Sequence, residues 1–286
     1  MRFINIATKI TTVEFMKRIF IFFICFVFLI LSLNLFDVSN PAKIGVPVFF
    51  TLVVFFSQFI LHYYQTKNKT QPYFLGLSIS KIVIKDFLTG IVLVLIVGSI
   101  SLFIELSIGW VKFEGFIWQS RNWALTRTGL TLILLVVCQQ LTTGWWEELV
   151  FRGYLIQVPI IENGFVVSAT VSSILFGISH YYLPPNIPLE VAIIDIVIGF
   201  LLAYCYSKRG LWFTIGLHFA WNTFPSSVFG LINPGTSIIK LSHNYPSWTT
   251  VSETLIDPWL LLLLFILGVF FVRSKSNYLV SSDCIV

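Results

Sequence analysis

The sequence predicts an all-α membrane protein, a polytopic helical bundle with about eight transmembrane helices. Hydrophobic residues make up 57% of the 286 residues, and charged residues only 11%. Soluble domains carry about 25% charged residues, so this composition excludes an ordinary soluble domain. Apolar stretches of the length that crosses a bilayer, about 20 residues, also recur along the whole chain. These two observations determine the predicted fold class.

Eight apolar stretches have the length and character expected of membrane spans. They cover residues 19–36, 44–64, 86–108, 129–155, 165–182, 189–206, 211–230 and 255–273. The first follows Lys17 and Arg18, as the apolar part of a signal peptide would. It is longer than such a segment usually is, and residues 34–37 offer no small-residue cleavage site. We therefore interpret it as a retained first span.

The basic residues predict the orientation of the chain. If the N-terminus is cytoplasmic, thirteen of the 18 Lys and Arg residues lie in inside segments and five lie outside. Because inside loops carry the excess of positive charge, both termini of a multi-pass protein are expected in the cytoplasm. The expected location is a bacterial plasma membrane. The basic residues are spread over short loops, so the lipid bilayer is an expected partner and nucleic acid is not.

Three connections are long enough to have structure of their own: 65–85, 109–128 and 231–254. The second mixes charge with the aromatic residues Trp110, Phe113, Phe116 and Trp118, which suggests a helix lying along the membrane interface. The third contains Asn-Pro-Gly and Asn-Tyr-Pro and reads as an irregular external loop. No internal repeat stands out, so we expect a single membrane domain over 1–286.

The cysteines give no sign of a disulfide framework or a zinc knuckle, because none of their spacings matches such a pattern. They are Cys25, Cys138, Cys205 and Cys284. The last lies one residue short of the C-terminal C-a-a-X pattern, so prenylation of this chain is not predicted.

Strongly polar residues inside the predicted spans are few, and a charge at the bilayer centre costs at least ~2.5–3.5 kcal/mol. The set is Glu105, Glu147, Glu148, Arg152, His180, Asp195, His218 and Asn222. Glu148 and Arg152 are four residues apart, so they can form an ion pair on one helix face. Glu147 then points about 100° away. His218 and Asn222 share the same four-residue spacing.

The depths of these residues can be compared by counting from the predicted turns. If spans four and five turn near Asn163, Glu147 and His180 lie at nearly the same depth, about 25 Å from that turn. Counted from Lys208, His218 and Asn222 lie roughly 15–21 Å along their helix. The sequence therefore allows these four side chains to converge.

Two kinds of hydrolytic chemistry fit this set of residues. A carboxylate beside a histidine can take a proton from water and pass it to a leaving group, while a histidine and an amide can stabilise an oxyanion. Glu and His are also zinc ligands, usually three together with one water. Both alternatives lead to hydrolysis of an acyl bond within the membrane.

Three motifs in this order resemble those of the CAAX protease and bacteriocin-processing (CPBP, or Abi) family, also called type II CAAX prenyl endopeptidases. They are Glu147-Glu148-x-x-x-Arg152, Phe176-x-x-x-His180 and His218-x-x-x-Asn222. Each lies on a separate predicted span, and the resemblance covers roughly residues 130–230, the expected catalytic core. It implies an intramembrane endopeptidase whose substrates are membrane-associated peptides or proteins.

The resemblance also implies a role for each residue. Glu147 would activate water, His180 would help to hold that water, and His218 and Asn222 would form the oxyanion hole. Glu148 and Arg152 would pair and maintain the shape of the site. A glutamate protease without a cofactor is favoured over a zinc protease, since Glu148 is committed to Arg152.

Other interpretations remain open for the chain and for its remaining polar residues. A transporter or a non-catalytic immunity factor could also place carboxylates and histidines in the membrane. Asp195 and Glu105 match no motif, and structural or solvent-lined positions are expected for them. Trp145, Trp146 and Trp221 are expected to pack the bundle, line a peptide groove or lie at the interface.

Overall fold

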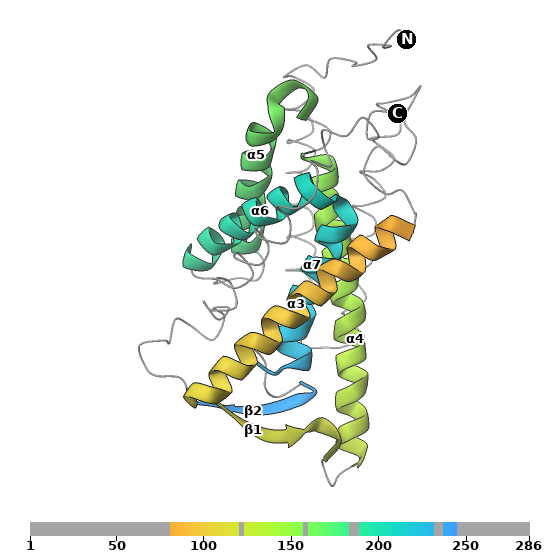
Figure 1. The fold of residues 1–286 in the computed structure, drawn as a ribbon, viewed down its shortest axis with the longest axis vertical. Helices are drawn as coiled ribbons and strands as arrows, with labels where there is room; N and C mark the ends of the chain where they lie inside the picture. The colour runs from red at the N-terminus through yellow and green to blue at the C-terminus, as the bar shows by residue number, and fades with distance from the viewer. Residues whose placement is uncertain (1–80, 120–122, 157–159, 183–188, 232–236, 245–286) are drawn as a thin grey trace. The chain divides into compact units, whose positions relative to one another are not determined.

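Helices account for 82% of the residues that the structure describes, as expected for a helical bundle. The structure is a computed structural model (Figure 1) and describes residues 81–119, 123–156, 160–182, 189–231 and 237–244. The predicted spans 19–36, 44–64 and 255–273 lie outside these ranges. The total of about eight spans therefore stays a prediction.

Each predicted span that falls in the described ranges is a helix. They are α3 (Lys81–Ile108), α4 (Trp123–Glu148), α5 (Ile160–Tyr182), α6 (Leu189–Arg209) and α7 (Leu211–Thr223). Two π-helical turns continue α4 and α7, over Leu149–Tyr154 and Phe224–Val228. The turn predicted at Asn163 lies next to Gly164, whose φ of 75° interrupts α5.

The surface of α3 has the polarity expected of a helix in lipid. Large apolar side chains are exposed at four-residue intervals along one face: Ile84, Leu88, Val92, Ile96 and Ile100. The opposite face buries Ser101 and Glu105 together with apolar residues, the reverse of a helix in water. Two of the described helices, Ile84–Ile108 and Val191–Arg209, are long and apolar enough to cross a membrane.

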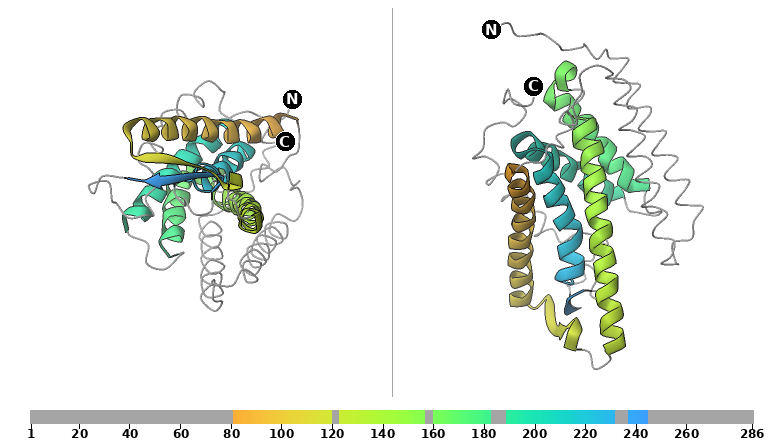
Figure 2. Two further views of the ribbon diagram at one scale, coloured as in Figure 1. Left: turned by 90° about the horizontal axis from the view of Figure 1, so that it is seen from below. Right: turned by 90° about the vertical axis from the view of Figure 1, so that its right-hand side faces the viewer.

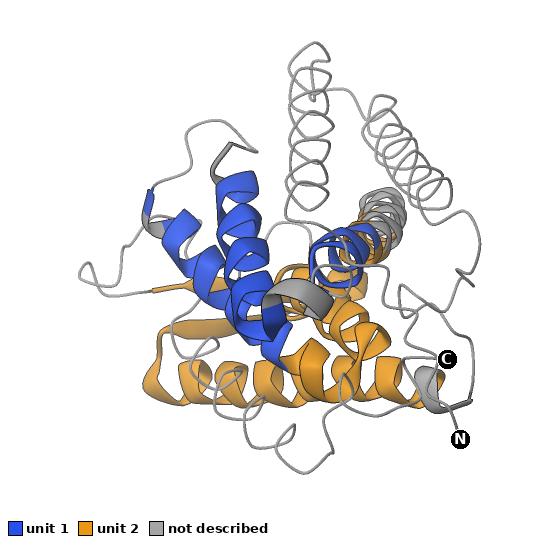
Figure 3. Cartoon of the chain, turned by 90° about the horizontal axis from the view of Figure 1, so that it is seen from above, with its two compact units in different colours: residues 1–78, 146–204, 282–286 blue, residues 79–145, 205–281 orange. Residues whose placement is uncertain are grey.

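The chain divides into two compact units (Figure 3). Within the described residues, the first unit holds the π turn after α4, all of α5 and most of α6, in residues 146–204. The second unit, residues 79–145 and 205–281, holds α3, β1, most of α4, α7 and β2. A single domain over 1–286 stays a prediction.

Small residues bring α5 and α6 together in the first unit. A Cβ atom on Gly177 would lie 2.4 Å from Ile196 Cγ1, and one on Gly199 would lie 2.9 Å from Ser173 Cα. Neither position has space for a side chain. Close backbone approach at small residues is a usual way to pack membrane helices, because lipid gives apolar side chains no incentive to associate. The packing fixes α5, which carries His180.

In the second unit, α3 and α7 lie side by side and pack closely against each other (Figure 2). A Cβ atom on Gly216 would lie 2.1 Å from Phe87 O, and one on Gly90 would lie 2.5 Å from Phe213 O. The rings of Phe87 and Phe219 stack, with centroids 6.4 Å apart. These contacts hold α7, on which His218 and Asn222 lie.

A short β-ribbon corrects two sequence predictions. Val111–Phe116 forms β1 and pairs antiparallel with β2, Ile239–His243, from Val111↔His243 to Phe116↔Ile239. The interfacial helix expected over 109–128 is therefore wrong for 111–116, and the irregular loop expected over 231–254 is wrong for 239–243. Pairing buries Val111 and Leu241 in one cluster. The ribbon is stabilised by contacts between segments that are distant in the sequence. The local sequence pattern of either strand therefore does not predict it.

Candidate active site

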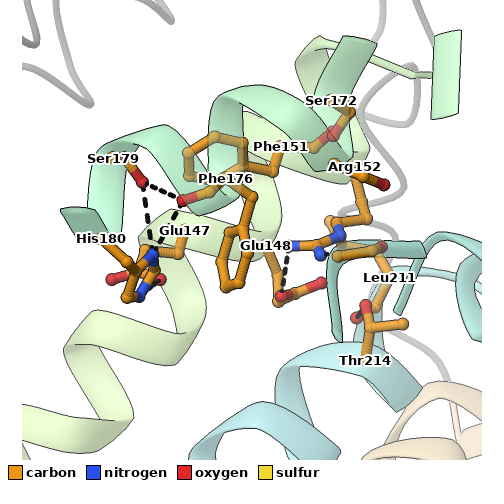
Figure 4. A network of polar contacts seen from close by, with 12 residues as sticks. Glu147, Glu148, Phe151, Arg152, Ser172, Phe176, Ser179, His180, Leu211 and Thr214 are labelled. Atoms are coloured by element: carbon orange, nitrogen blue, oxygen red, sulfur yellow. Dashed lines mark hydrogen bonds and ion pairs between the residues drawn. The ribbon is translucent and has the colours of Figure 1, made fainter. Parts of the chain in front are cut away.

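Glu147 and His180 face each other in the first unit (Figure 4). Glu147 is the penultimate residue of α4 and His180 lies in the last turn of α5. The distance from Glu147 Oε2 to His180 Nε2 is 3.8 Å, and their side chains are 11% and 30% exposed. This separation exceeds a direct hydrogen bond and suits a bridging water. The proximity expected from their equal depths is present.

The other ring nitrogen of His180 is held by its own helix. His180 Nδ1 lies 2.9 Å from Phe176 O, and a carbonyl oxygen only accepts. Nδ1 therefore carries a proton that it donates to Phe176 O. In the neutral imidazole this leaves Nε2 as an acceptor on the side of Glu147. Ser179 Oγ also donates to Phe176 O, at 2.7 Å, and lies 3.3 Å from His180 Nδ1.

Glu148 and Arg152 form the ion pair that their spacing predicts. Arg152 Nη1 donates to Glu148 Oε1 at 2.8 Å, and both side chains are fully buried. Arg152 Nη2 also donates to Gly199 O on α6, at 3.2 Å, and the guanidinium lies over the Phe176 ring. A buried charge is tolerated only when it is paired and hydrogen-bonded. Arg152 thus joins α4, α5 and α6.

A π-helical turn, Leu149–Tyr154, follows Glu148 directly and ends the predicted span. Leu155 N–H donates to Val150 O at 2.9 Å, five residues back. In an α-helix that donor would bond to Phe151 O; here Ser172 Oγ–H bonds to Phe151 O at 2.6 Å. The apolar pattern of residues 129–155 predicts one continuous helix and carries no signal for this turn. Such turns occur frequently at functional sites.

His218 and Asn222 lie on α7, in the second unit. His218 is buried and Asn222 is partly buried. A π-helical turn follows here as well, and Pro225 accounts for it, because proline has no N–H to donate to the carbonyl four residues back. The structure thus brings Glu147 to His180 and Glu148 to Arg152 in one unit. The meeting of these residues with His218 and Asn222 in one site stays a prediction.

The remaining polar and aromatic candidates lie in the helix packing. Glu105 is fully buried and accepts a hydrogen bond from Ser101 Oγ at 3.3 Å. Asp195 is 8% exposed on α6. Trp145 packs edge-on against Trp212, with ring centroids 5.1 Å apart, which is one of the positions expected for it.

A zinc site of the usual kind needs three protein ligands. Among the residues that the structure describes, no group of three or more His, Cys, Asp or Glu side chains is placed to hold a metal ion. Glu148 forms an ion pair with Arg152. In residues 146–204, Glu147 and His180 are the two possible metal ligands that face each other.

Comparison with known proteins identifies the family of this segment. Residues 129–224 match the model of a family described as type II CAAX prenyl endopeptidase Rce1-like. A search of curated proteins and a search of solved structures each gave no match. The matched segment contains all three motifs, from Glu147 to Asn222. The resemblance predicted from these motifs is therefore confirmed: residues 129–224 match the model of the Rce1-like family, whose description is that of a type II CAAX prenyl endopeptidase.

Proposed function

We propose that this protein is an intramembrane glutamate endopeptidase that hydrolyses a peptide bond of a membrane-associated protein or peptide. The observation that carries the proposal is the pair of Glu147 and His180. Glu147 Oε2 lies 3.8 Å from His180 Nε2. The other ring nitrogen, Nδ1, is hydrogen-bonded to Phe176 O. Two acceptors at this separation are suited to holding one water molecule between them.

The chemistry follows from the hydrogen bonds that such a water makes. It donates one hydrogen to Glu147 and the other to His180 Nε2, so its lone pairs are free to attack a peptide carbonyl. As the new C–O bond forms, Glu147 accepts the proton as general base. The carbonyl oxygen becomes an oxyanion. The proton is then delivered to the amide nitrogen, the C–N bond breaks, and a carboxylic acid and an amine leave.

His218 and Asn222 are proposed to donate hydrogen bonds to that oxyanion, a role implied by the family motif. Their i,i+4 spacing places both donors on one face of α7. Within the second unit, a Cβ atom on Gly144 of α4 would lie 3.0 Å from Phe219 N, next to His218. This contact holds α7, and with it both donors, against α4 within that unit.

The substrate is proposed to be a membrane-anchored peptide, either a prenylated C-terminus, as in the family's description, or a bacteriocin-type peptide. Each would bring an apolar anchor into the bilayer beside the scissile bond. The proposal needs no cofactor and no nucleic acid.

We also propose a multi-pass arrangement in a bacterial plasma membrane, with both termini cytoplasmic. Two contacts at opposite ends of α3 support it. The β1–β2 ribbon joins two connections that are both expected outside. At the other end, Arg209 Nη2 lies 2.9 Å from Asp86 Oδ1, where both segments are expected inside. A helix of 28 residues is about 42 Å long, which is enough to separate these contacts by a bilayer.

His180→Ala tests the proposed role of the histidine. We expect cleavage to fall by about 10²-fold or more, because the water loses one of its two acceptors. The measurement is the rate of cleavage of a lipidated peptide by the purified protein in bilayer nanodiscs. His243→Ala is the matched control, since His243 donates to Gly230 O in the ribbon, outside the family segment. If His180→Ala cleaves as fast as the His243 variant, His180 does not hold the water.

Chelation separates the glutamate mechanism from the zinc alternative. We expect the cleavage rate to be unchanged after treatment with a strong chelator, and elemental analysis to find no stoichiometric zinc. A metal-dependent enzyme would lose activity and regain it when zinc is restored. That result would favour the zinc alternative, in which the ligands are Glu147, Glu148, His180 and His218.

A further inference from the structure

We propose that the β1–β2 ribbon carries a surface that binds the lipid headgroup layer, at the end of α3 from which β1 leads. We call this surface the aromatic rim, and it consists of Phe113, Phe116 and Trp118. Phe113 is 51% exposed and Trp118 is 53% exposed. The rim lies outside the family segment of residues 129–224, so this role does not depend on peptide cleavage.

The three rings of the aromatic rim form one continuous cluster. The Phe116 and Trp118 rings stack with their centroids 4.7 Å apart and 6° between their planes. The Phe113 ring packs edge-on against Phe116 at 5.1 Å. Tryptophan is enriched at membrane–water interfaces, where its ring lies at the level of the headgroups, and the two phenylalanines add apolar area beside it. The rim therefore has the composition of an interfacial anchor.

The strand pairing gives the ribbon one apolar and one polar face. Side chains alternate between the faces along a strand, and directly paired residues share a face. Val111, Phe113 and Leu241 are on the apolar face by this register, and Val111 and Leu241 are buried in a cluster with side chains of α3. The opposite face consists of Lys112, Glu114, Lys240 and Ser242. On that face Ser242 Oγ donates to Glu114 Oε1 at 2.6 Å. Such a ribbon fits a boundary between lipid and water.

The length of α3 places the ribbon at the level of the headgroups. Lys85 is charged and exposed, so it lies outside the hydrocarbon, and no residue of α3 between Asp86 and Glu105 is charged. A hydrocarbon core of about 30 Å takes up about 20 residues of helix, which ends near Glu105. From there to the turn at Gly109 the chain rises about 6 Å, and the headgroup layer is about 5–8 Å thick on each side. β1 therefore begins within this layer.

The exposed apolar face of α3 continues to the aromatic rim. In its last two turns α3 exposes Phe103, Leu106 and Ile108. The turn at Gly109, with a φ of 77°, then leads directly to β1 (Figure 1). Because the rim continues a face that lies in lipid, we assign it to lipid rather than to a second copy of the chain or to a peptide. Lys112 is exposed on the polar face, where its charge can pair with lipid phosphates.

The test measures the surroundings of Trp118 in the full-length protein, reconstituted in phosphatidylcholine vesicles. Some of the lipid carries bromine, a fluorescence quencher, on the acyl chain close to the headgroup or close to the chain end. The emission of Trp118 is the difference between the wild type and Trp118→Phe. We expect it to be quenched most by bromine close to the headgroup, less by bromine at the chain end, and least by acrylamide in the water.

Two further tryptophans provide a matched control and a second reading, both in the Trp118→Phe background. Ser242→Trp places the ring on the opposite face of the same ribbon, where we expect strong quenching by acrylamide and weak quenching by brominated lipid. Phe113→Trp places it at another position of the aromatic rim and should repeat the result for Trp118. Agreement of the two rim positions, against Ser242→Trp, supports the proposal.

Three outcomes would overturn the proposal. Quenching of Trp118 by acrylamide alone would mean that the rim faces water, as a docking surface for a soluble peptide does. Protection from both quenchers, with cross-linking between two chains, would assign the rim to a second copy. Equal quenching of Trp118 and Ser242→Trp by brominated lipid would mean that the two faces of the ribbon do not differ. None of these measurements requires cleavage, so they remain decisive if the proposed function fails.

Discussion

Glu147→Gln is expected to lower the rate of peptide cleavage by about 10²–10⁴-fold, the usual contribution of a general base. The amide keeps the size of the side chain but cannot take the proton from water. KM should change little, since the loss falls on the chemical step. The measurement is steady-state cleavage of a lipidated peptide, together with comparative peptidomics of cells that carry the wild-type or the variant protein.

Glu105→Gln is the matched control for this experiment. Glu105 is also a buried acid in a membrane helix, but it lies outside the matched family segment, and we expect cleavage to persist when it is replaced. Equal activity of the wild type and Glu147→Gln would exclude Glu147 as the base. In a non-catalytic transporter or immunity factor, no variant would affect cleavage, because the wild type would cleave nothing.

Arg152→Leu is expected to destabilise the protein by about 3–5 kcal/mol, because it leaves the fully buried Glu148 carboxylate without its cation. The measurement is the unfolding free energy in mixed detergent micelles. The double variant Glu148→Leu/Arg152→Leu should recover part of this loss, since replacing both members of a buried pair is often nearly neutral.

Activity distinguishes a purely structural ion pair from one that the reaction needs. The double variant should fold yet cleave slowly, because Arg152 also bonds to Gly199 O and contacts the Phe176 ring, and these contacts hold the helices that position Glu147 and His180. If instead the double variant is no more stable than Arg152→Leu, the stability of this region does not depend on pairing of the two charges.

The helices could be predicted from the sequence because membrane spans depend on a local property. A bilayer requires about 20 apolar residues in a row, and α3, α5, α6 and α7 each overlap a predicted stretch. The β-ribbon could not be predicted in this way. Val111 pairs with His243, and the stability of that pairing depends on contacts between segments that are distant in the chain.

The candidate site was predictable where helix geometry alone determines a contact. The four-residue spacing predicted the ion pair of Glu148 and Arg152. Equal depth on either side of one turn predicted that Glu147 and His180 lie close together. Neither argument identifies Ser172 or the bond from His180 Nδ1 to Phe176 O, because both depend on which backbone carbonyls are free to accept. The bond of Ser172 depends on the π turn after α4, and the bond of His180 on the last turn of α5.

The β1–β2 ribbon also has a consequence for the order in which the protein assembles during synthesis. Residues 146–204, which contain Glu147 and His180, are translated before α7 and before β2. Because β1 leaves the ribosome long before β2, it has to wait for its partner while four helices are made. Chains fold progressively from the N-terminus as they emerge, so β2 pairs with β1 only after the helices between them have been synthesised. A nascent chain arrested before residue 239 would lack it.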